Sequence, residues 1–272
     1  MKRYIHWIFA VIITFGLSGC YSSSTNSGAV GVKRKQFMML SSQQINQGAR
    51  LAYTKVITGA KQKHALNKDH AMVNRLNKIM RRLVPQTVVF RPDAVNWKWE
   101  VNLIQSNQLN AWCMPGGKIA FYSGIINRLK LNDDQIAAIM GHEMSHALRE
   151  HSRERASRNY ATQMTINIGA QLLGLGRGTA SLANQVANVT LTLPNSREAE
   201  READRMGVEL AARAGYNPKE AIKVWEKMAR LSKSSPPEIL STHPIHAHRI
   251  ADLKQYSSIV WPLYLQARKR YN

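Results

Sequence analysis

A pair of histidines four residues apart constrains this chain more than any other feature of its sequence. His142 and His146 enclose Glu143 in the run His-Glu-Met-Ser-His, within a segment whose apolar residues have helical spacing. Positions four apart on a helix differ by about 40° in direction, so both imidazoles can bind one metal ion. Glu143 is turned by about 100° from His142 and can reach a water molecule on that metal. We therefore expect this segment to be a helix that carries part of a metal centre.

Length, composition and charge restrict the class of protein. The 272 residues suffice for one large domain, and the 44% hydrophobic and 20% charged residues exclude a disordered, collagen-like or polytopic membrane chain. Two cysteines exclude a disulfide-rich scaffold. The net charge of +21 indicates an acidic surface as partner, but the chain has an export signal and no nucleic-acid-binding motif. We therefore expect no nucleic-acid partner.

The first residues have the pattern of an export signal. Two basic residues precede a mostly apolar run over residues 4–17, which is shorter than the ~20 residues of a membrane-spanning helix. The run ends in Leu-Ser-Gly-Cys, which resembles the lipobox of bacterial lipoproteins. The resemblance implies that a signal peptide of residues 1–19 is removed and that Cys20 is lipidated. An ordinary signal peptide with an incidental cysteine is the alternative.

The residues after Cys20 bear on location. Tyr21 stands where an aspartate retains many such lipoproteins at the inner membrane, so the resemblance implies the periplasmic face of a Gram-negative outer membrane. The Ser- and Gly-rich composition that follows is typical of a flexible tether. We therefore predict a lipidated, flexible segment over residues 20–40 and a folded body over residues 41–272.

The body is predicted to be an α+β domain, mainly helical, with a small central β-sheet. Apolar residues spaced by three and four predict two basic amphipathic helices over residues 41–84, whose cationic face is either solvated or directed to an anionic lipid surface. Segments rich in Val, Ile and aromatic residues predict three strands, at residues 87–90, 98–105 and 118–122. Beyond residue 132 the pattern is helical, which gives a core over residues 85–256 and a C-terminal helix over residues 257–272.

A catalytic zinc ion needs a third protein ligand. His151 lies nine residues after His142, on the opposite side of a continuous helix, so we expect it on the surface or on another face. Glu200 and Asp204 are better candidates, because they are four residues apart and share a helical face. A charged, ion-paired surface helix is the ordinary meaning of such a run and stays open as the alternative.

Taken together, these segments resemble the gluzincin metallopeptidase family that includes HtpX, LoiP and BepA, peptidase family M48. The matched elements lie between about residues 75 and 255, in the same order as in the family. They are Asn110-Ala111, Pro115-Gly116-Gly117 with the following strand and Gly124, the His-Glu-x-x-His helix, the pattern Ser-Arg-x-x-Glu-x-x-Ala-Asp of residues 196–204, and His243-Pro244 with Arg249. The implied fold is a zincin-like metallopeptidase domain.

The resemblance assigns roles to particular residues. It implies one Zn²⁺ per chain, bound by His142, His146 and Glu200, with Glu143 as the general base. Asp204 is implied to be either a residue behind the ligands or a proton donor, and Arg197 to support the carboxylates. His243 is implied either to stabilise the oxyanion or to occupy the open position of the zinc ion as a reversible plug.

The implied activity is that of a zinc-dependent endopeptidase for unfolded or misassembled cell-envelope proteins. We expect an extended substrate to pair with an edge strand formed by Lys118, Ile119, Ala120, Phe121 and Tyr122. The alternative is a chaperone-like factor for outer-membrane protein assembly, in contact with the assembly machinery, whose protease activity is minor or blocked by His243. A membrane-surface scaffold that uses the basic helices is a third hypothesis. Cys113 is expected to be a buried free thiol.

Overall fold

The motif helix forms as predicted and lies in the core. The computed structural model describes residues 21–172, 182–232, 237–244 and 248–271, and in it α5 (Asp133–Leu148) contains the motif. Asn132 caps this helix by accepting from the backbone N–H of Gln135, whose side chain accepts in return from the N–H of Asn132. Every residue from Gln135 to Leu148 is buried. A helix buried on all sides has neighbours around it, and these supply the rest of the site.

The predicted α+β class is confirmed, with helices forming most of the described chain. The helices are α2 (Ser42–Gln62), α3 (His70–Leu83), α4 (Ser123–Arg128), α5, α6 (His151–Leu172), α7 (Leu182–Leu191), α8 (Arg197–Arg213), α9 (Glu220–Ser232), α10 (Ile239–Thr242), α11 (Arg249–Ile259) and α12 (Trp261–Arg268), with 3₁₀ helices η1 (Val84–Val89) and η2 (Pro92–Asn96). The strands are β1 (Tyr21–Ser22), β2 (Gln36–Phe37), β3 (Glu100–Ile104), β4 (Ala111–Met114) and β5 (Lys118–Tyr122). None of the helices in the described ranges has the length and apolar character needed to cross a bilayer.

The central sheet corrects one prediction about the substrate edge. Its strand order is β3-β5-β4, with β5 parallel to β3 and antiparallel to β4. The predicted edge strand of residues 118–122 is therefore the central strand, with both of its edges paired. The two outer strands are β3 and β4, and β4 was not predicted because its four residues, all buried, show no alternation of apolar and polar side chains.

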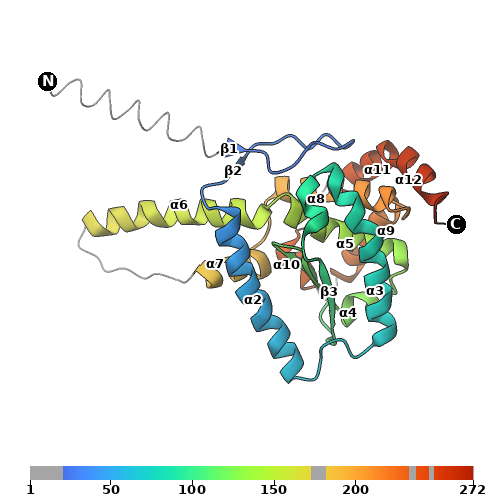
Figure 1. Cartoon of the computed structure of the whole chain (residues 1–272), viewed down its shortest axis with the longest axis horizontal. Coiled ribbons are helices and arrows are strands. Elements are labelled where there is room, and N and C mark those ends of the chain that lie inside the picture. The colour runs from blue at the N-terminus through green and yellow to red at the C-terminus, as the bar shows by residue number, and fades with distance from the viewer. Residues whose placement is uncertain (1–20, 173–181, 233–236, 245–247, 272) are drawn as a thin grey trace.

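Two apolar clusters cover the two faces of the sheet. Cys113, Ile119 and Phe121 belong to the main core, whereas Trp112 and Ala120 belong to a second cluster that includes side chains of α2 and α7. Adjacent residues of a strand point to opposite faces, which accounts for this division. Figure 1 shows α2 and α7 on one side of the sheet and α3 and α9 on the other.

Two of the predicted segments differ in the structure. Residues 87–90 lie largely in η1 instead of a strand, because Pro85 near the start of η1 fixes a helical φ and Phe90 turns into the core. The predicted C-terminal helix is divided, since α11 ends at Ile259 and α12 begins at Trp261 with Pro262 in its first turn. The missing N–H of Pro262 suits a first turn but not a helix interior.

The two predicted basic helices are confirmed as α2 and α3. α2 has a capping box of Ser41 and Gln44, and it buries Ile45, Ala49 and Ala52 on one face. α3 begins after Asp69, whose side chain accepts from the N–H of Met72, and its buried residues are Leu76, Ile79, Met80 and Leu83. The spacing of three and four in the sequence therefore identified the buried faces correctly.

The prediction of a flexible tether is wrong for residues 21–40. β1 and β2 pair with each other, and Val30 and Val32 are buried in the main core. Gly28 has φ +61°, and this turn directs the backbone N–H groups of Ala29 and Val30 to the carboxylate of Glu209. The serine side chains of this segment thus form hydrogen bonds, and Gly28 forms a tight turn. The predicted signal peptide and Cys20 lie outside the described residues.

Candidate metal centre

The close crossing of α5 and α8 positions the site. At the crossing, a Cβ atom added to Gly141 would lie 2.9 Å from the carbonyl oxygen of Gly207, and one added to Gly207 would lie 2.8 Å from the nitrogen of His142. Two glycines therefore let the two backbones touch. Ser196 caps the start of α8 by accepting from the N–H of Ala199. The first turns of α8 consequently face the histidines of α5.

Four side chains converge there, from three parts of the chain. One ligand atom each of His142, His146, Glu200 and His243 lies within 4.8 Å of all the others, and all four residues are buried. Nε2 of His142 is 3.1 Å from Nε2 of His146, and Oε1 of Glu200 is 3.3 Å from Nε2 of His146 and 2.9 Å from Nδ1 of His243. The pattern predicted that the first three would meet, and the geometry brings them together.

The donor set fits a zinc ion. Imidazole nitrogens and one carboxylate are zinc ligands, and a fourth position remains for His243 or for another ligand. The buried oxygen Oε1 of Glu143 has no hydrogen-bond partner among the described residues. It lies 3.6 Å from Nε2 of His243. An unsatisfied carboxylate oxygen beside a ligand group is where the general base of a hydrolytic site is needed.

The charges of the group are mutually compensating. Burial alone would raise the pKa of Glu200, but the charges of His243 and Arg249 hold it well below its ordinary value of 4.5. Burial lowers the pKa of His146 well below 6.5. Burial acts in the same direction on His142, but Asp204 and Glu200 outweigh it and raise the pKa of His142 to about 9. The pKa values of these side chains therefore depend on burial and on the charged neighbours within the same group.

Asp204 lies behind His142, on the side away from the ligand group. Its Oδ1 is 3.0 Å from Nδ1 of His142, and Arg249 contacts both carboxylate oxygens at 2.7 and 2.9 Å. Arg249 also lies 2.8 Å from Oε2 of Glu200. Burial alone would raise the pKa of Asp204, but Arg249 and His142 lower it. The contact places Asp204 behind the ligand His142, which is one of the two roles predicted for it.

Arg249 and not Arg197 supports the carboxylates. Arg197 is exposed at the first position of α8, whereas Arg249 is buried against Glu200 and Asp204. Arg249 also lies over the ring of Trp225, with Cζ 3.4 Å from the ring centroid. The sequence pattern contained both arginines but gave no sign of which one would be buried.

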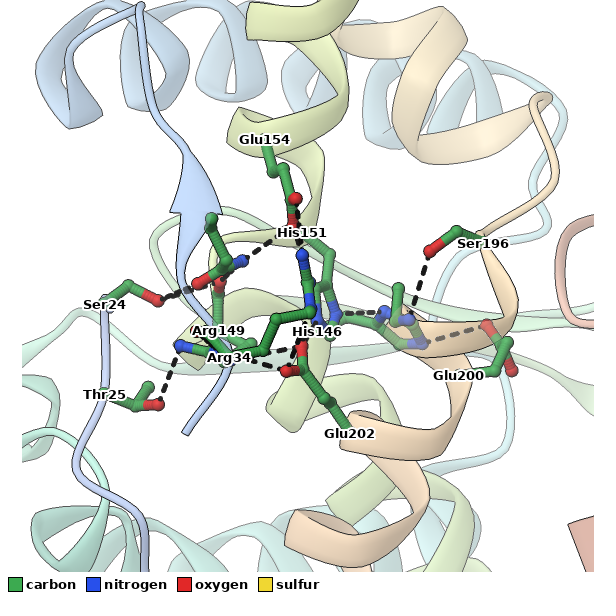
Figure 2. A network of polar contacts seen from close by, with 12 residues as sticks. Ser24, Thr25, Arg34, His146, Arg149, His151, Glu154, Ser196, Glu200 and Glu202 are labelled. Atoms are coloured by element: carbon green, nitrogen blue, oxygen red, sulfur yellow. Dashed lines mark hydrogen bonds and ion pairs between the residues drawn. The ribbon is translucent and has the colours of Figure 1, made fainter. Parts of the chain in front are cut away.

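The prediction that His151 lies on the surface or on a remote face is wrong. The chain turns between α5 and α6, and Glu150 in this turn has φ +53°, so no continuous helix joins the two histidines. His151 is buried, with Nδ1 2.8 Å from Nδ1 of His146 and Nε2 3.0 Å from Oε2 of Glu202 (Figure 2). Glu202 is also buried, although it lies on another face of α8 than Glu200. Neither residue belongs to the ligand group.

β4 is the strand beside the site. A small cavity next to the ligand group is lined by Trp112, Cys113, Glu143, His146 and His243, among others. Within the described ranges only β5 pairs with β4, so the other edge of β4 has no strand partner there. Cys113 is a buried free thiol, as predicted, and burial raises its pKa well above 9.0.

Nearby residues hold His243 in place. The backbone N–H of Asn195 donates to the carbonyl oxygen of Thr242 at 2.9 Å, and Nδ2 of Asn195 lies 3.4 Å from Nδ1 of His243. Arg155 in turn donates to the side chain of Asn195 and to the carbonyl oxygen of Leu193. No motif in the sequence singled out Asn195 or Arg155.

A buried His-His-Glu group on two crossed helices, with a glutamate between the histidines, defines a metallopeptidase site of the His-Glu-x-x-His type. Comparison with known protein families agrees with this assignment. The family described as "Peptidase family M48" matches residues 71–257 of the chain. The chain therefore belongs to peptidase family M48.

Several proteins of known name are similar to this chain. The mitochondrial metalloendopeptidase OMA1 of Saccharomyces cerevisiae is 34% identical over 182 residues, which are 62% of this chain and 50% of that protein. OMA1 of Schizosaccharomyces pombe is 28% identical over 94% of this chain and 72% of its own length. The beta-barrel assembly-enhancing protease of Escherichia coli (strain K12) is 28% identical over 75% of this chain and 42% of its own length. The chain thus spans about half the length of two of these relatives.

Proposed function

We propose that this chain is a zinc-dependent endopeptidase that hydrolyses peptide bonds of unfolded or misassembled cell-envelope proteins. The observation that carries the proposal is the buried group of His142, His146 and Glu200, with the unsatisfied oxygen of Glu143 beside it. Membership of peptidase family M48 and the names of the similar proteins, which are a metalloendopeptidase and a protease, support it.

The residues of the site divide the chemistry among them. When bound, zinc polarises the scissile carbonyl and lowers the pKa of a water molecule at the site. Glu143 accepts the proton of the attacking water and delivers it to the leaving amine. Asp204, held by Arg249, keeps His142 oriented with Nε2 toward the ligand group. In this scheme His243, once displaced from Glu200, donates to the developing oxyanion.

The edge of β4 that has no strand partner among the described residues supports the proposed substrate class. An extended chain that pairs there presents its backbone to Glu143 through main-chain hydrogen bonds, which depend little on sequence. Unfolded or misassembled chains offer long extended segments whose backbone groups are unpaired, so they are the proposed substrates. This assigns to β4 the role that the sequence had suggested for residues 118–122.

The proposed location is the periplasm, with a lipid anchor at Cys20 in an outer membrane. The short apolar run over residues 4–17 and the Leu-Ser-Gly-Cys ending support this. The E. coli relative carries beta-barrel assembly in its name, whereas the yeast relatives are named mitochondrial. The basic faces of α2 and α3 are a proposed second contact with anionic lipid.

The second candidate function is a chaperone-like factor for outer-membrane protein assembly, with a blocked protease site. The position of His243 favours it, because Nδ1 of His243 lies within the ligand group, 2.9 Å from Glu200. A histidine there fills the position that water needs. The same residue thus serves either as a reversible plug or as an oxyanion donor.

Zinc content measured beside cleavage of an unfolded protein tests both candidates. We expect the full chain, purified in detergent, to bind one zinc ion and to degrade casein. Glu143→Gln should keep zinc and lose at least about 100-fold in turnover. A gain of activity in His243→Ala would identify a plug, and a loss an oxyanion donor. Zinc binding without cleavage in any variant, together with folding assistance that survives Glu143→Gln, would favour the assembly factor.

A further inference from the structure

The N-terminal segment reaches the metal centre through a continuous set of buried polar contacts. We call residues 21–37 the N-terminal strap. Arg34 of the strap contacts Glu202 at 2.9 Å, Glu202 contacts His151 at 3.0 Å, and His151 contacts His146 at 2.8 Å. Figure 2 shows these side chains together. In this view Arg34, Arg149, His151 and Glu202 lie below Glu154.

Proton positions along this path are determined by the ligand role of His146. Its Nε2 faces the ligand group, 3.3 Å from Glu200, so this nitrogen must be unprotonated to bind a metal. Nδ1 of His146 then carries the proton and donates to Nδ1 of His151. Nε2 of His151 is consequently the protonated nitrogen, and it donates to Glu202. Every member of the path has one consistent tautomer.

Glu202 is held from two further directions. Arg149, which is 0% exposed, donates from Nε and Nη2 to the two carboxylate oxygens. Arg34 also donates from Nε and Nη2, one to each oxygen. The other guanidinium contacts of Arg34 go to Glu154 at 2.6 and 2.8 Å. Paired contacts of a planar guanidinium fix both the place and the plane of a carboxylate.

The strap also fixes Arg149 and α8 directly. Arg149 donates to the backbone oxygen of Arg34, and Gln36 donates to the backbone oxygen of Arg149 at 2.7 Å. Earlier in the strap, the backbone N–H groups of Ala29 and Val30 donate to the carboxylate of Glu209 in α8. The strap therefore contacts both the α5–α6 turn and the helix that carries Glu200.

We propose that His151 is a positioning residue for the ligand His146, and that the N-terminal strap sets its position through Arg34 and Glu202. A ligand histidine whose second nitrogen is held by a fixed partner has a fixed ring orientation and a more basic ligand nitrogen. The strap thereby tunes the affinity of the centre for zinc from a segment far from it in sequence. This inference rests on the metal centre of the proposed function, but not on its proteolytic activity.

Zinc affinity of the full chain, in detergent, tests the path by competition with a chromophoric chelator. We expect His151→Ala to weaken zinc binding by about 10- to 100-fold. His151→Asn should recover part of the loss, because its amide oxygen occupies the place of Nδ1 and can accept from His146. Arg34→Gln should weaken binding by up to about 10-fold.

Arg158→Gln is the matched control for Arg34. Arg158 pairs with the same Glu154 at 2.9 Å but has no contact with Glu202, so its loss should leave zinc affinity within about twofold. Cobalt bound in place of zinc provides a second measurement, since a change in ligand orientation shifts its visible absorption bands in His151→Ala and not in Arg158→Gln.

The outcomes separate this inference from the proposed function. If Arg34→Gln and His151→Ala lower the melting temperature but bind zinc as the wild type does, the contacts are only structural and the inference is wrong. Equal losses in Arg34→Gln and Arg158→Gln would also overturn it. A wild type that binds zinc and cleaves nothing would contradict the proposed function alone, whereas a wild type without zinc would end both.

Discussion

Arg249 is the residue on which the charge balance of the centre depends. The residue is 2% exposed, and its guanidinium contacts the carboxylates of both Glu200 and Asp204. Burial lowers the pKa of Arg249, but the carboxylates of Asp204 and Glu200 outweigh it and raise the pKa above its ordinary value. Taking this one cation away leaves two buried carboxylates in the absence of a metal.

We therefore predict that Arg249→Ala lowers the free energy of unfolding of the metal-free protein by about 3–5 kcal/mol. Arg201→Ala is a matched control, since Arg201 joins Asp252 between the same two helices but is 54% exposed. Its loss should cost no more than about 1 kcal/mol. Urea unfolding in the presence of a chelator measures both values, and equal effects would contradict the prediction.

A second prediction concerns acid stability through Glu154. Burial alone would raise the pKa of Glu154, but hydrogen bonds from Arg34, Arg158 and Gln36 lower it from 4.5 to about 2. The unfolded state therefore binds a proton first as pH falls, so the stabilisation is full above about pH 4.5 and is lost toward about pH 2. Glu154→Gln should be less stable at neutral pH and lose less stability over that window. Unfolding midpoints measured from about pH 7 to 3 test this, and parallel curves would refute it.

Single residues also show where sequence reasoning succeeded. The spacing of His142 and His146 placed both imidazoles on one helical face, because helical periodicity is a local property, whereas Glu200 was assigned to the same group through the resemblance to the family. The position of His151 was predicted wrongly because the positive φ of Glu150 ends the helix. The sequence has no glycine there that would have indicated a turn. The buried contacts of Glu202 could not be predicted from local pattern either, because one of its partners is Arg34, which is distant in sequence.

At the scale of elements, the contact of α5 with α8 is the feature that assembles the site. The two helices meet at Gly141 and Gly207, where either added Cβ would be 2.9 Å or less from a backbone atom of the other helix. A methyl group at this point must push the helices apart and move Glu200 away from the histidines.

Gly207→Ala should therefore destabilise the protein by about 1–3 kcal/mol and weaken zinc binding. Gly59→Ala in α2 is the control, because no atom lies within 4 Å of the added Cβ. There the better helix propensity of alanine should stabilise by roughly 0.5–1 kcal/mol. Opposite signs in thermal unfolding of the two variants are the expected result, and stabilisation by both would show that α5 and α8 separate without cost.

Predictability also differs among the elements. The long helices with one apolar face were found from their periodicity, and so were β3 and β5. β4 was missed because it is four residues long and buried throughout. Strand order was not predictable from local pattern, since the pairing of β5 with both β3 and β4 depends on which segments meet in space.

For the whole molecule, the metal centre joins parts that are far apart in the chain. The ligand group takes residues from α5, from α8 and from the end of α10. A metal that binds only this arrangement stabilises the native state by mass action, by about 2.7 kcal/mol at a free concentration of 100 times Kd.

Chelation of the metal should consequently lower the melting temperature of the wild type. The variant His146→Ala, which lacks one ligand, should start lower and should not respond to the chelator. Scanning calorimetry with and without chelator measures this difference. A chelator effect of the same size in both proteins would mean that the metal binds elsewhere.

The packing of the N-terminal strap determines how far the enzyme can work from its proposed anchor. A flexible tether of about 20 residues would allow a root-mean-square reach of roughly 25 Å from the bilayer. Instead, the described residues are already paired at Tyr21 and Ser22, which form β1 against β2. If Cys20 carries the proposed lipid, this packing would hold the folded body against the headgroups and limit cleavage to chains that come to the membrane surface.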